Sequence, residues 1–470
     1  MDRAVTSALT IDADGIHDPY RRKVAITAVL AAMALVVLDA AIANIALPTI
    51  SQSLRVSPAS AIWVVTAYQL GLVASLLPAS ALGESFGYRK LFFAGTILFV
   101  VASVVCALSP SLECLVASRF VQGIGGASIM ALGIALLRLV VPQHRLGAAI
   151  GWNALTVALA SAAGPTLGAT ILSSASWPWL FAVNIPIGAL VLVAAFSLPY
   201  TSGTRLPVDF ASVALSGAAF GLLVIGVDSV SSHGLLAVAL LAGASTFAWL
   251  LIRRERGRIS PLVPLDLLRR VSFRVSVVAS VVIFIGQSTA LVALPFYLQH
   301  NLNLTPLATG LYLLPWPLSV ALVGPIAGRL SDKVATSWLC LLGGILLFAG
   351  LASATLWTAS APPFAFPICM AICGAGFGLF NVPNNRNMFM SAPPERSGAA
   401  GGLQGVARLT GQTFGAVAVG TLFQLLPLTD APRTALPVGA ALILAAGVIS
   451  VLRTSHDLRS ISDDHRRDAR

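Results

Sequence analysis

Two opposite charges lie inside apolar stretches of the chain, where charged side chains are rare. Asp39 lies in VVLDAAIANIALPTI, residues 36–50, and Arg119 lies in SRFVQGIGGA, residues 118–127. An ionised carboxylate is costly in apolar surroundings, and the uptake of a proton removes that cost. Arginine keeps its proton, so Arg119 would be a fixed charge that stabilises ionised Asp39. The pair predicts coupling between protonation and movement; a purely structural ion pair, or an arginine bound to backbone carbonyls, is the alternative.

The composition indicates a membrane protein. Of 470 residues, 57% are hydrophobic and 10% are charged, whereas about 25% are charged in a soluble domain. The net charge of +11 is divided among short breaks between apolar runs, which argues against nucleic-acid binding, because that needs one basic face. The five cysteines follow no disulfide or zinc spacing. We therefore expect no metal and no other cofactor, and no ATP-binding motif is present.

Fourteen apolar runs are long enough to span a bilayer. They cover about 24–46, 60–81, 91–109, 112–138, 147–171, 179–199, 208–228, 233–252, 272–297, 305–328, 337–358, 363–389, 397–424 and 432–452. Basic residues gather in every second break, which places both termini in the cytoplasm by the positive-inside rule. An odd number of spans would destroy this alternation. We expect a multi-pass protein of the inner (plasma) membrane.

Asp39 is the only acid well inside a predicted span. It follows Lys23 by 16 residues, so it lies roughly 24 Å along the first helix, in the outer half of the bilayer core. Arg119 lies roughly 10 Å from the outer end of the fourth span, at a comparable depth. The two charges are therefore expected to meet.

An internal repeat suggests two halves. SALGESFGYRK, residues 80–90, follows the second span, and the similar AGRLSDKVATSW, residues 327–338, lies in the second half of the chain. Such repeats are typical of secondary transporters. The predicted segments are an N-terminal tail (1–23), a six-helix bundle (24–199), two inserted helices with a basic linker (200–271), a second six-helix bundle (272–452) and a C-terminal tail (453–470).

Several signatures in order resemble one family. VLDAAIANIALPTI, SRFVQGIGGA, SAAGPTLGA (residues 161–169) and WPWLFAVNIPIG (residues 177–188) are similar to motifs of the major facilitator superfamily, in its fourteen-span drug:proton antiporter branch of the QacA and EmrB type. The resemblance implies an all-α membrane fold of two six-helix halves plus two inserted transmembrane helices. It covers roughly residues 20–455.

The chain departs from the usual signatures at several positions. They are Ala41, Ser80, Glu84, Ser85, Tyr88, Ala169 and Ala335. These departures bear on the strength of the predicted cytoplasmic gate and leave the expected fold intact.

Three further groups of residues are candidates for function. Gly164, Pro165 and Gly168 match the antiporter motif, which implies a hinge, although plain helix packing would use the same residues. The predicted cytoplasmic gate comprises Glu84, Gly87, Arg89, Arg329 and Asp332, which could instead be ordinary topology charges. The predicted substrate cavity comprises Tyr68, Gln69, Gln287, Tyr312, Trp316, Asn381, Asn384, Gln404 and Arg408; packing is the alternative for each.

Asn44 and Pro48 are interpreted as the end of the first helix, with an unwound outer gate as the alternative.

These features predict a proton-coupled exporter of hydrophobic drug-like compounds that works by alternating access. The partners are a lipophilic small molecule, protons and the lipid bilayer; a periplasmic adaptor is left open, and a monomer is expected. A dedicated exporter of a natural product or metabolite, and a proton-coupled solute importer, are the alternatives. All six histidines fall in tails, loops or span ends, so no catalytic site is expected and the protein is interpreted as not an enzyme.

Overall fold

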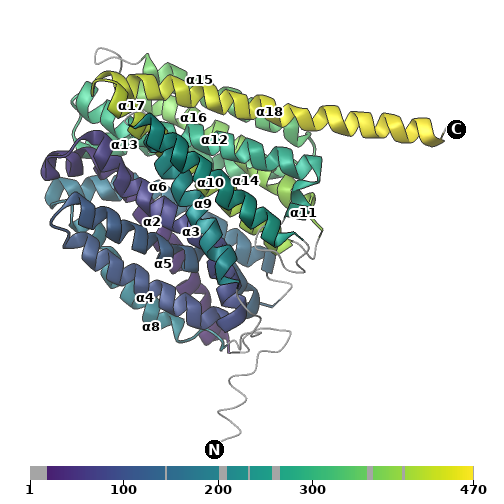
Figure 1. Cartoon of the computed structure of the whole chain (residues 1–470), viewed down its shortest axis with the longest axis horizontal. Coiled ribbons are helices and arrows are strands. Elements are labelled where there is room, and N and C mark those ends of the chain that lie inside the picture. Colours follow the sequence, from purple (N-terminus) through teal and green to yellow (C-terminus); the bar gives the residue numbers. More distant parts are fainter. Residues whose placement is uncertain are drawn as a thin grey trace, which may run out of the picture. The chain divides into compact units, whose positions relative to one another are not determined.

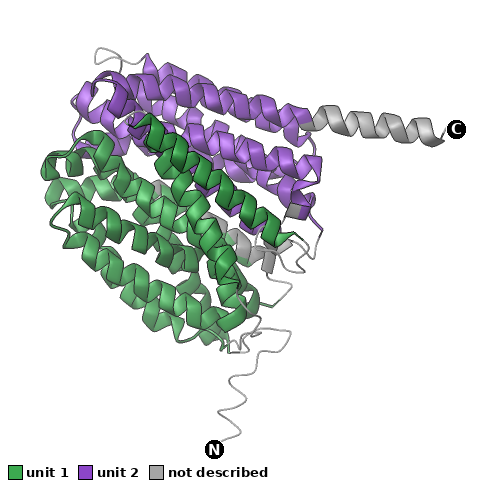
Figure 2. Cartoon of the chain, in the orientation of Figure 1, with its two compact units in different colours: residues 1–258 green, residues 259–470 purple. Residues whose placement is uncertain are grey.

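The computed structural model describes residues 18–142, 146–200, 209–230, 233–256, 265–356, 362, 364–393 and 397–468. The regular elements of these residues are helices (Figure 1). Three of the basic residues in the breaks that were predicted to be cytoplasmic, Arg145, Arg205 and Arg396, lie outside the described residues. Two compact units divide the chain, residues 1–258 and 259–470, and Figure 2 colours them separately.

The first unit contains the helices of the predicted N-terminal bundle together with the predicted inserted pair. The helices are α2 (Pro19–Leu54), α3 (Pro58–Phe86), α4 (Tyr88–Ala107), α5 (Leu112–Val140), α6 (Leu146–Ser174), α7 (Trp179–Ala182), α8 (Asn184–Ala195), α9 (Phe210–Asp228) and α10 (Gly234–Glu255). Helices α9 and α10 pack on each other, and α9 also packs on α3. A separate inserted segment over 200–271 stays a prediction.

The second unit is built around α12. Its elements are α11 (Leu265–Leu268), α12 (Val271–Phe296), the π-helical turn η2 (Tyr297–Asn301), α13 (Pro306–Leu313), α14 (Pro315–Leu330), α15 (Thr336–Thr355), α16 (Ala365–Met390), α17 (Ser397–Leu425) and α18 (Asp430–Asp468). Helix α12 packs on α16, α17 and α18, while α15 packs on α16 and α18. Helix α18 continues without a break past residue 452, where the last span was predicted to end.

Eleven helices of the described residues are long and apolar enough to cross a membrane. This number is lower than the fourteen spans predicted from the sequence. The difference falls on α6, α17 and the shorter apolar stretch Trp179–Ala195, which are not among the eleven. Large apolar side chains stand exposed on several of the eleven, such as Leu235 and Val238 of α10. Lipid would cover such side chains in a membrane.

The start of several helices follows directly from the sequence. Asp18 precedes Pro19, and the Asp18 carboxylate accepts a hydrogen bond from the Tyr20 amide at 2.9 Å. Ser57 caps α3 in the same way, with Pro58 in the first turn. A capping side chain followed by proline suits a helix start, because proline lacks only a donor that would be unpaired there.

The interpretation of Asn44 and Pro48 as a helix end is wrong. Helix α2 continues through Pro48 to Leu54 and ends where Arg55 adopts a left-handed conformation with φ 54°. The Asn44 side chain donates to the carbonyl of Ala40 at 3.2 Å, one turn back in the same helix. Proline is tolerated inside a packed apolar helix when neighbouring groups compensate for the lost backbone bond.

The sixth predicted span, residues 179–199, is interrupted near its start. Helix α7 ends at Ala182, and α8 begins two residues later at Asn184. Pro186 explains the break, because its ring clashes with the carbonyl four residues earlier, that of Ala182. The tenth predicted span is broken at Leu314, which precedes Pro315 and Pro317. Proline therefore converts two single spans into pairs of shorter helices.

Glycines let α3 and α5 approach closely. A Cβ atom added to Gly71 would collide with the Phe120 carbonyl oxygen of α5, and one added to Gly123 would collide with the Tyr68 carbonyl oxygen of α3. Gly95 and Gly125 fill the same role between α4 and α5. Small residues at helix contacts are a general means of tight packing in membranes. They fix the spacing of three helices that carry polar side chains.

The two copies of the repeated loop have different backbones. Gly87 separates α3 from α4 with φ 101°, a conformation that favours glycine. In the second copy five residues lie between α14 and α15, and Ala335 has φ −56°. The second loop has a negative φ at this position, which an alanine adopts without strain.

The packing of Gly71 leads to a stability prediction. Gly71→Ala is expected to lower the free energy of unfolding by about 1–3 kcal/mol, because the added methyl group meets backbone that cannot yield easily. Gly221→Ala on α9 is the matched control, since nothing lies within 4 Å of its added Cβ. Thermal unfolding of the detergent-solubilised variants measures the difference. Equal melting temperatures for the two variants would contradict the proposed close contact.

Candidate functional site

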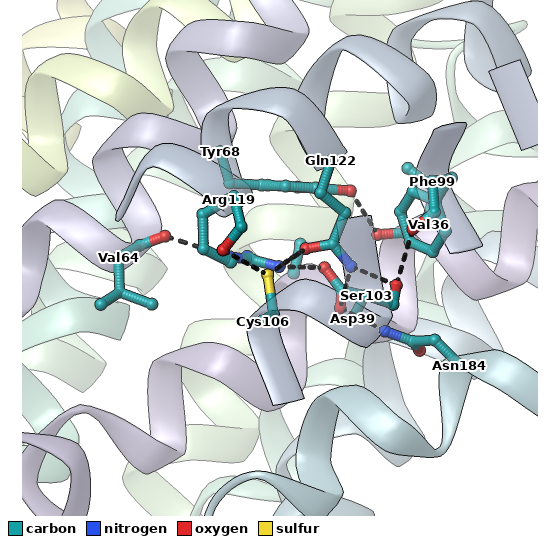
Figure 3. Close-up of polar contacts among 12 residues, drawn as sticks. Val36, Asp39, Val64, Tyr68, Phe99, Ser103, Cys106, Arg119, Gln122 and Asn184 are labelled. Carbon is teal, nitrogen blue, oxygen red and sulfur yellow. Dashed lines mark hydrogen bonds and ion pairs between the residues drawn. The ribbon is translucent and has the colours of Figure 1, made fainter. Parts of the chain in front are cut away.

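The structure brings Asp39 and Arg119 into direct contact. Asp39 of α2 is 1% exposed and Arg119 of α5 is 0% exposed. The Arg119 Nη1 atom lies 2.5 Å from the Asp39 Oδ2 atom (Figure 3). Arg119 Nε also donates to the Val64 carbonyl of α3 at 3.1 Å. Both sequence interpretations of Arg119, the carboxylate pair and the backbone-bound arginine, therefore describe part of its contacts.

Gln122 connects the charged pair to α4. Its Oε1 atom accepts from Arg119 Nη1 at 2.6 Å, and its Nε2 atom donates to Asp39 Oδ1 at 3.1 Å and to Ser103 Oγ at 2.8 Å. Ser103 in turn donates to the carbonyl of Phe99 at 2.8 Å. These contacts fix the orientation of the glutamine amide, because its oxygen and nitrogen have different partners.

Helices α7 and α8 contribute one contact to each of the two charges. Asn184, the first residue of α8, donates from Nδ2 to Asp39 Oδ1 at 2.6 Å. The Arg119 guanidinium lies over the Phe181 ring of α7 at 5.3 Å and over the Tyr68 ring of α3 at 4.1 Å. Cation–π contacts of this kind stabilise a desolvated cation. Tyr68 is held in place by donating from its hydroxyl to the Val36 carbonyl at 3.1 Å.

Three side chains donate hydrogen bonds to the Asp39 carboxylate. They are Arg119, Gln122 and Asn184. Hydrogen bonds to an ionised carboxylate are shorter and stronger than those between neutral groups. A proton added to Asp39 would remove half of the ion pair and demand a new hydrogen-bond acceptor. The arrangement can therefore translate protonation into a changed contact between α2 and α5.

Asp39 and Arg119 were predicted from the sequence as a pair and Tyr68 as a residue of the substrate cavity, whereas Gln122 and Asn184 were not predicted as members of this site. Both missed residues stand inside quoted signatures, SRFVQGIGGA and WPWLFAVNIPIG. The feature of the sequence that could have identified them is a side-chain amide in an apolar run, three residues after Arg119 for Gln122 and two residues before Pro186 for Asn184.

The antiporter-motif residues lie on α6 against α2. A Cβ added to Gly164 would collide with the side chain of Ala41, and one added to Gly168 would lie 2.7 Å from Ile45 Cγ2. Ala41 replaces the usual threonine of the first signature, and its methyl group is what Gly164 accommodates. Pro165 lies inside α6 between the two contacts. The contact is close helix packing; a hinge at this position stays a prediction.

The predicted gate residues lie at helix ends in each unit. Arg89 Nη2 donates to the Phe196 carbonyl at 3.2 Å, and Glu84 lies in the last turn of α3 before Gly87. In the second unit Asp332 pairs with Arg386 of α16 at 2.5 Å, and Arg386 Nη1 also donates to Ser331 at 2.6 Å. Arg329 lies in the last turn of α14. The ion pair with Asp332 places the Arg386 side chain at the loop between α14 and α15.

The predicted cavity residues divide between the two units. Tyr68 and Gln69 belong to the first, and the others, in the second, are Gln287, Tyr312, Trp316, Asn381, Asn384, Gln404 and Arg408. Asn384 is fully buried and donates to Ser280 Oγ at 2.7 Å, so it joins α16 to α12. Gln404 donates to Asn385 at 3.4 Å, and Asn385 donates to Asn381 at 3.2 Å. A common cavity for these residues stays a prediction.

Two other shielded acids lie at helix ends. Glu255, at the end of α10, is 3% exposed and accepts from Ser212 at 2.6 Å. Asp228, at the end of α9, accepts from Trp63 Nε1 at 3.2 Å. Asp39 differs from both because it lies in the middle of a long apolar helix.

The buried ion pair leads to a second stability prediction. Arg119→Met is expected to lower the free energy of unfolding by about 3–5 kcal/mol, because it leaves Asp39 buried without its charge partner. The double variant Asp39→Asn with Arg119→Met is expected to be more stable than Arg119→Met alone. Thermal unfolding of the solubilised variants measures both.

A matched control is Arg254→Met. Arg254 is 45% exposed and pairs with Asp209 at 2.7 Å. An exposed pair contributes at most about 1 kcal/mol. Equal losses for Arg119→Met and Arg254→Met would contradict the energetic importance of burial.

Comparison with known proteins agrees with this architecture. A family model described as Major Facilitator Superfamily matches residues 29–416 and, in an overlapping match, 276–465. An uncharacterized transporter of Escherichia coli strain K12, YebQ, is 42% identical over 94% of this chain and 98% of its own length.

Two more distant relatives carry functional names. The riboflavin transporter RibZ of Clostridioides difficile strain 630 is 30% identical, over 82% of this chain and 84% of its own. The multidrug resistance protein Stp of Mycobacterium tuberculosis strain CDC 1551 / Oshkosh is 30% identical, over 83% and 73%. The chain therefore belongs to the Major Facilitator Superfamily of membrane transporters.

Proposed function

We propose that this transporter exports lipophilic, drug-like compounds in exchange for protons. The observation that carries the proposal is the Asp39–Arg119 pair, fully buried in the first unit at 2.5 Å. An ionisable pair of this kind inside a membrane helix bundle is by default a functional group, because its insertion is costly.

Protonation of Asp39 is the proposed coupling step. With Asp39 ionised, Arg119 and the amide donors hold α2 against α5 and α8. A proton on Asp39 removes the attraction between the charges, while Arg119 keeps its contacts to Val64, Gln122, Tyr68 and Phe181. Helix α2 then loses its strongest polar contact and is free to shift. Protonation from outside would favour return of the empty carrier, and release inside would reset it.

The proposed substrate is neutral or carries a single positive charge. Arg408 lies inside α17, whereas the acids of the described part of residues 271–452 are Asp332, between α14 and α15, and Asp430, at the start of α18. A dication would therefore find no second acid deep among the described helices. Buried polar atoms that lack a hydrogen-bond partner, Gln69 Oε1 and Trp316 Nε1, are candidate contacts for substrate.

A dedicated exporter of one metabolite is the second candidate. The relative RibZ carries the name of a riboflavin transporter, whereas Stp carries the name of a multidrug resistance protein. The same ion pair would serve either substrate range, so the choice between them falls to transport measurements.

The proposed topology has fourteen spans with both termini in the cytoplasm of an inner (plasma) membrane. Eleven helices meet the criteria of length and hydropathy. Helices α6 and α17, with 29 residues each, and the α7–α8 pair would supply the other three. This arrangement would place Glu84, Gly87 and Arg89 on the same side as Arg329 and Asp332, where the Asp332–Arg386 pair would open and close with the cycle. Exposed ion pairs are weak enough to break in each cycle.

The transport prediction uses everted membrane vesicles energised by respiration. The wild type is expected to take up ethidium and to dissipate part of the pH gradient when ethidium is added, because uptake of ethidium releases protons. Asp39→Asn is expected to lose proton-driven uptake, since the amide carries no titratable proton.

Asp228→Asn is the matched control, because it neutralises a half-buried acid at a helix end and should leave transport unchanged. Ethidium uptake that survives Asp39→Asn with its proton coupling intact would remove Asp39 from the mechanism. Absence of ethidium transport in the wild type, together with proton-coupled riboflavin transport, would favour the dedicated exporter.

A further inference from the structure

Asn184 has one unusual feature beyond its contact with Asp39. Its side chain is 0% exposed, and its Nδ2 atom donates to Asp39 Oδ1 at 2.6 Å. Its Oδ1 atom is buried as well and has no hydrogen-bond partner. Buried polar atoms are nearly always paired, so an unpaired amide oxygen beside a titratable carboxyl group needs an explanation.

The chemistry of the two side chains supplies one. An ionised carboxylate only accepts hydrogen bonds, whereas a protonated carboxyl group has a hydrogen to donate. A primary amide donates from its nitrogen and accepts at its oxygen. A half-turn of the amide about the Cβ–Cγ bond would therefore exchange the partner that ionised Asp39 needs for the partner that protonated Asp39 needs.

We propose that Asn184 is a positioning residue that holds Asp39 in both protonation states by turning its amide. This inference rests on the proposed proton coupling through Asp39. The proton adds to Asp39 Oδ1, the bond from Asn184 Nδ2 breaks, and the new O–H donates to Asn184 Oδ1.

The other partners of Asp39 cannot take this role. Arg119 has only donors. Gln122 would lose its contacts to Arg119, at 2.6 Å, and to Ser103, at 2.8 Å, if its amide turned. Asn184 is therefore the partner of Asp39 whose acceptor atom is still available.

The other groups around Asp39 do not compete with Asn184 for the hydrogen bond from protonated Asp39. Among the described residues, the titratable side chains near the carboxyl group are Arg119 of α5, Cys106 of α4 and Tyr68 of α3. Cys106 donates to Ser118 at 3.1 Å, and Tyr68 donates to the Val36 carbonyl at 3.1 Å. Helices α6, α7 and α8 contain no titratable side chain.

The test is infrared spectroscopy of the purified full-length protein in lipid. The carbonyl band of protonated Asp39 is isolated as the difference between wild type and Asp39→Asn as the pH is lowered. In Asn184→Leu this band is expected to shift to higher frequency, because the acid hydrogen loses its acceptor. Asn153→Leu on α6 is the matched control, since Asn153 is also buried with an unpaired Oδ1 atom; its band is expected to stay in place.

The outcomes separate this inference from the proposed function. An unchanged band in Asn184→Leu would overturn the role of Asn184, whether or not the protein transports ethidium. A shifted band without proton-driven transport would retain the amide contact and reject the proposed function. No Asp39 band at any pH at which the protein stays folded would overturn both. Asn184→Ala gives the same comparison if the leucine variant does not fold.

Discussion

The architecture of the first unit is organised around one buried ion pair. Removing two charges from water is expensive, and their attraction offsets that penalty only with good geometry and additional hydrogen bonds. Here α3 supplies the Val64 carbonyl and the Tyr68 ring, α5 supplies Arg119 and Gln122, and α8 supplies Asn184. Together with α2, which carries Asp39, these make four helices that must keep their mutual positions.

Small residues make this arrangement possible. Gly71 and Gly123 bring α3 and α5 into backbone contact, so that Arg119 reaches the carbonyl of Val64 without a gap. Gly164 and Gly168 leave room for the side chains of Ala41 and Ile45 where α6 packs on α2, the helix that carries Asp39. Lipid provides no hydrophobic drive for helices to associate, so close packing and buried hydrogen bonds must hold the bundle together. The glycines provide the close packing of the first unit, and the polar pair provides its buried hydrogen bonds.

The sequence predicted those contacts for which physical chemistry allows few alternatives. A charge in an apolar run must find a partner, so Asp39 and Arg119 were predictable as a pair. The continuation of α2 through Pro48 was not, because apolar packing around a proline is a tertiary effect that no local pattern reveals. The pairing of Asp332 with Arg386 was missed because the two residues lie 54 positions apart, and only the fold brings α16 to that loop. Gln122 and Asn184 are uncharged, so composition alone gave them no distinction from packing residues.

The junction between α7 and α8 carries two residues that contact the ion pair. Pro186 ends α7 at Ala182, and the chain restarts at Asn184. Phe181, on one side of the break, lies over the Arg119 guanidinium, and Asn184, on the other side, bonds to Asp39. Phe181 and Asn184 are three positions apart, and Val183 between them keeps helical dihedral angles, φ −59° and ψ −25°. Residues at this spacing lie on the same face of a helical segment, so one short segment contacts both charges. A change at either charge therefore reaches the same backbone, which links the ion pair to the shape of the bundle.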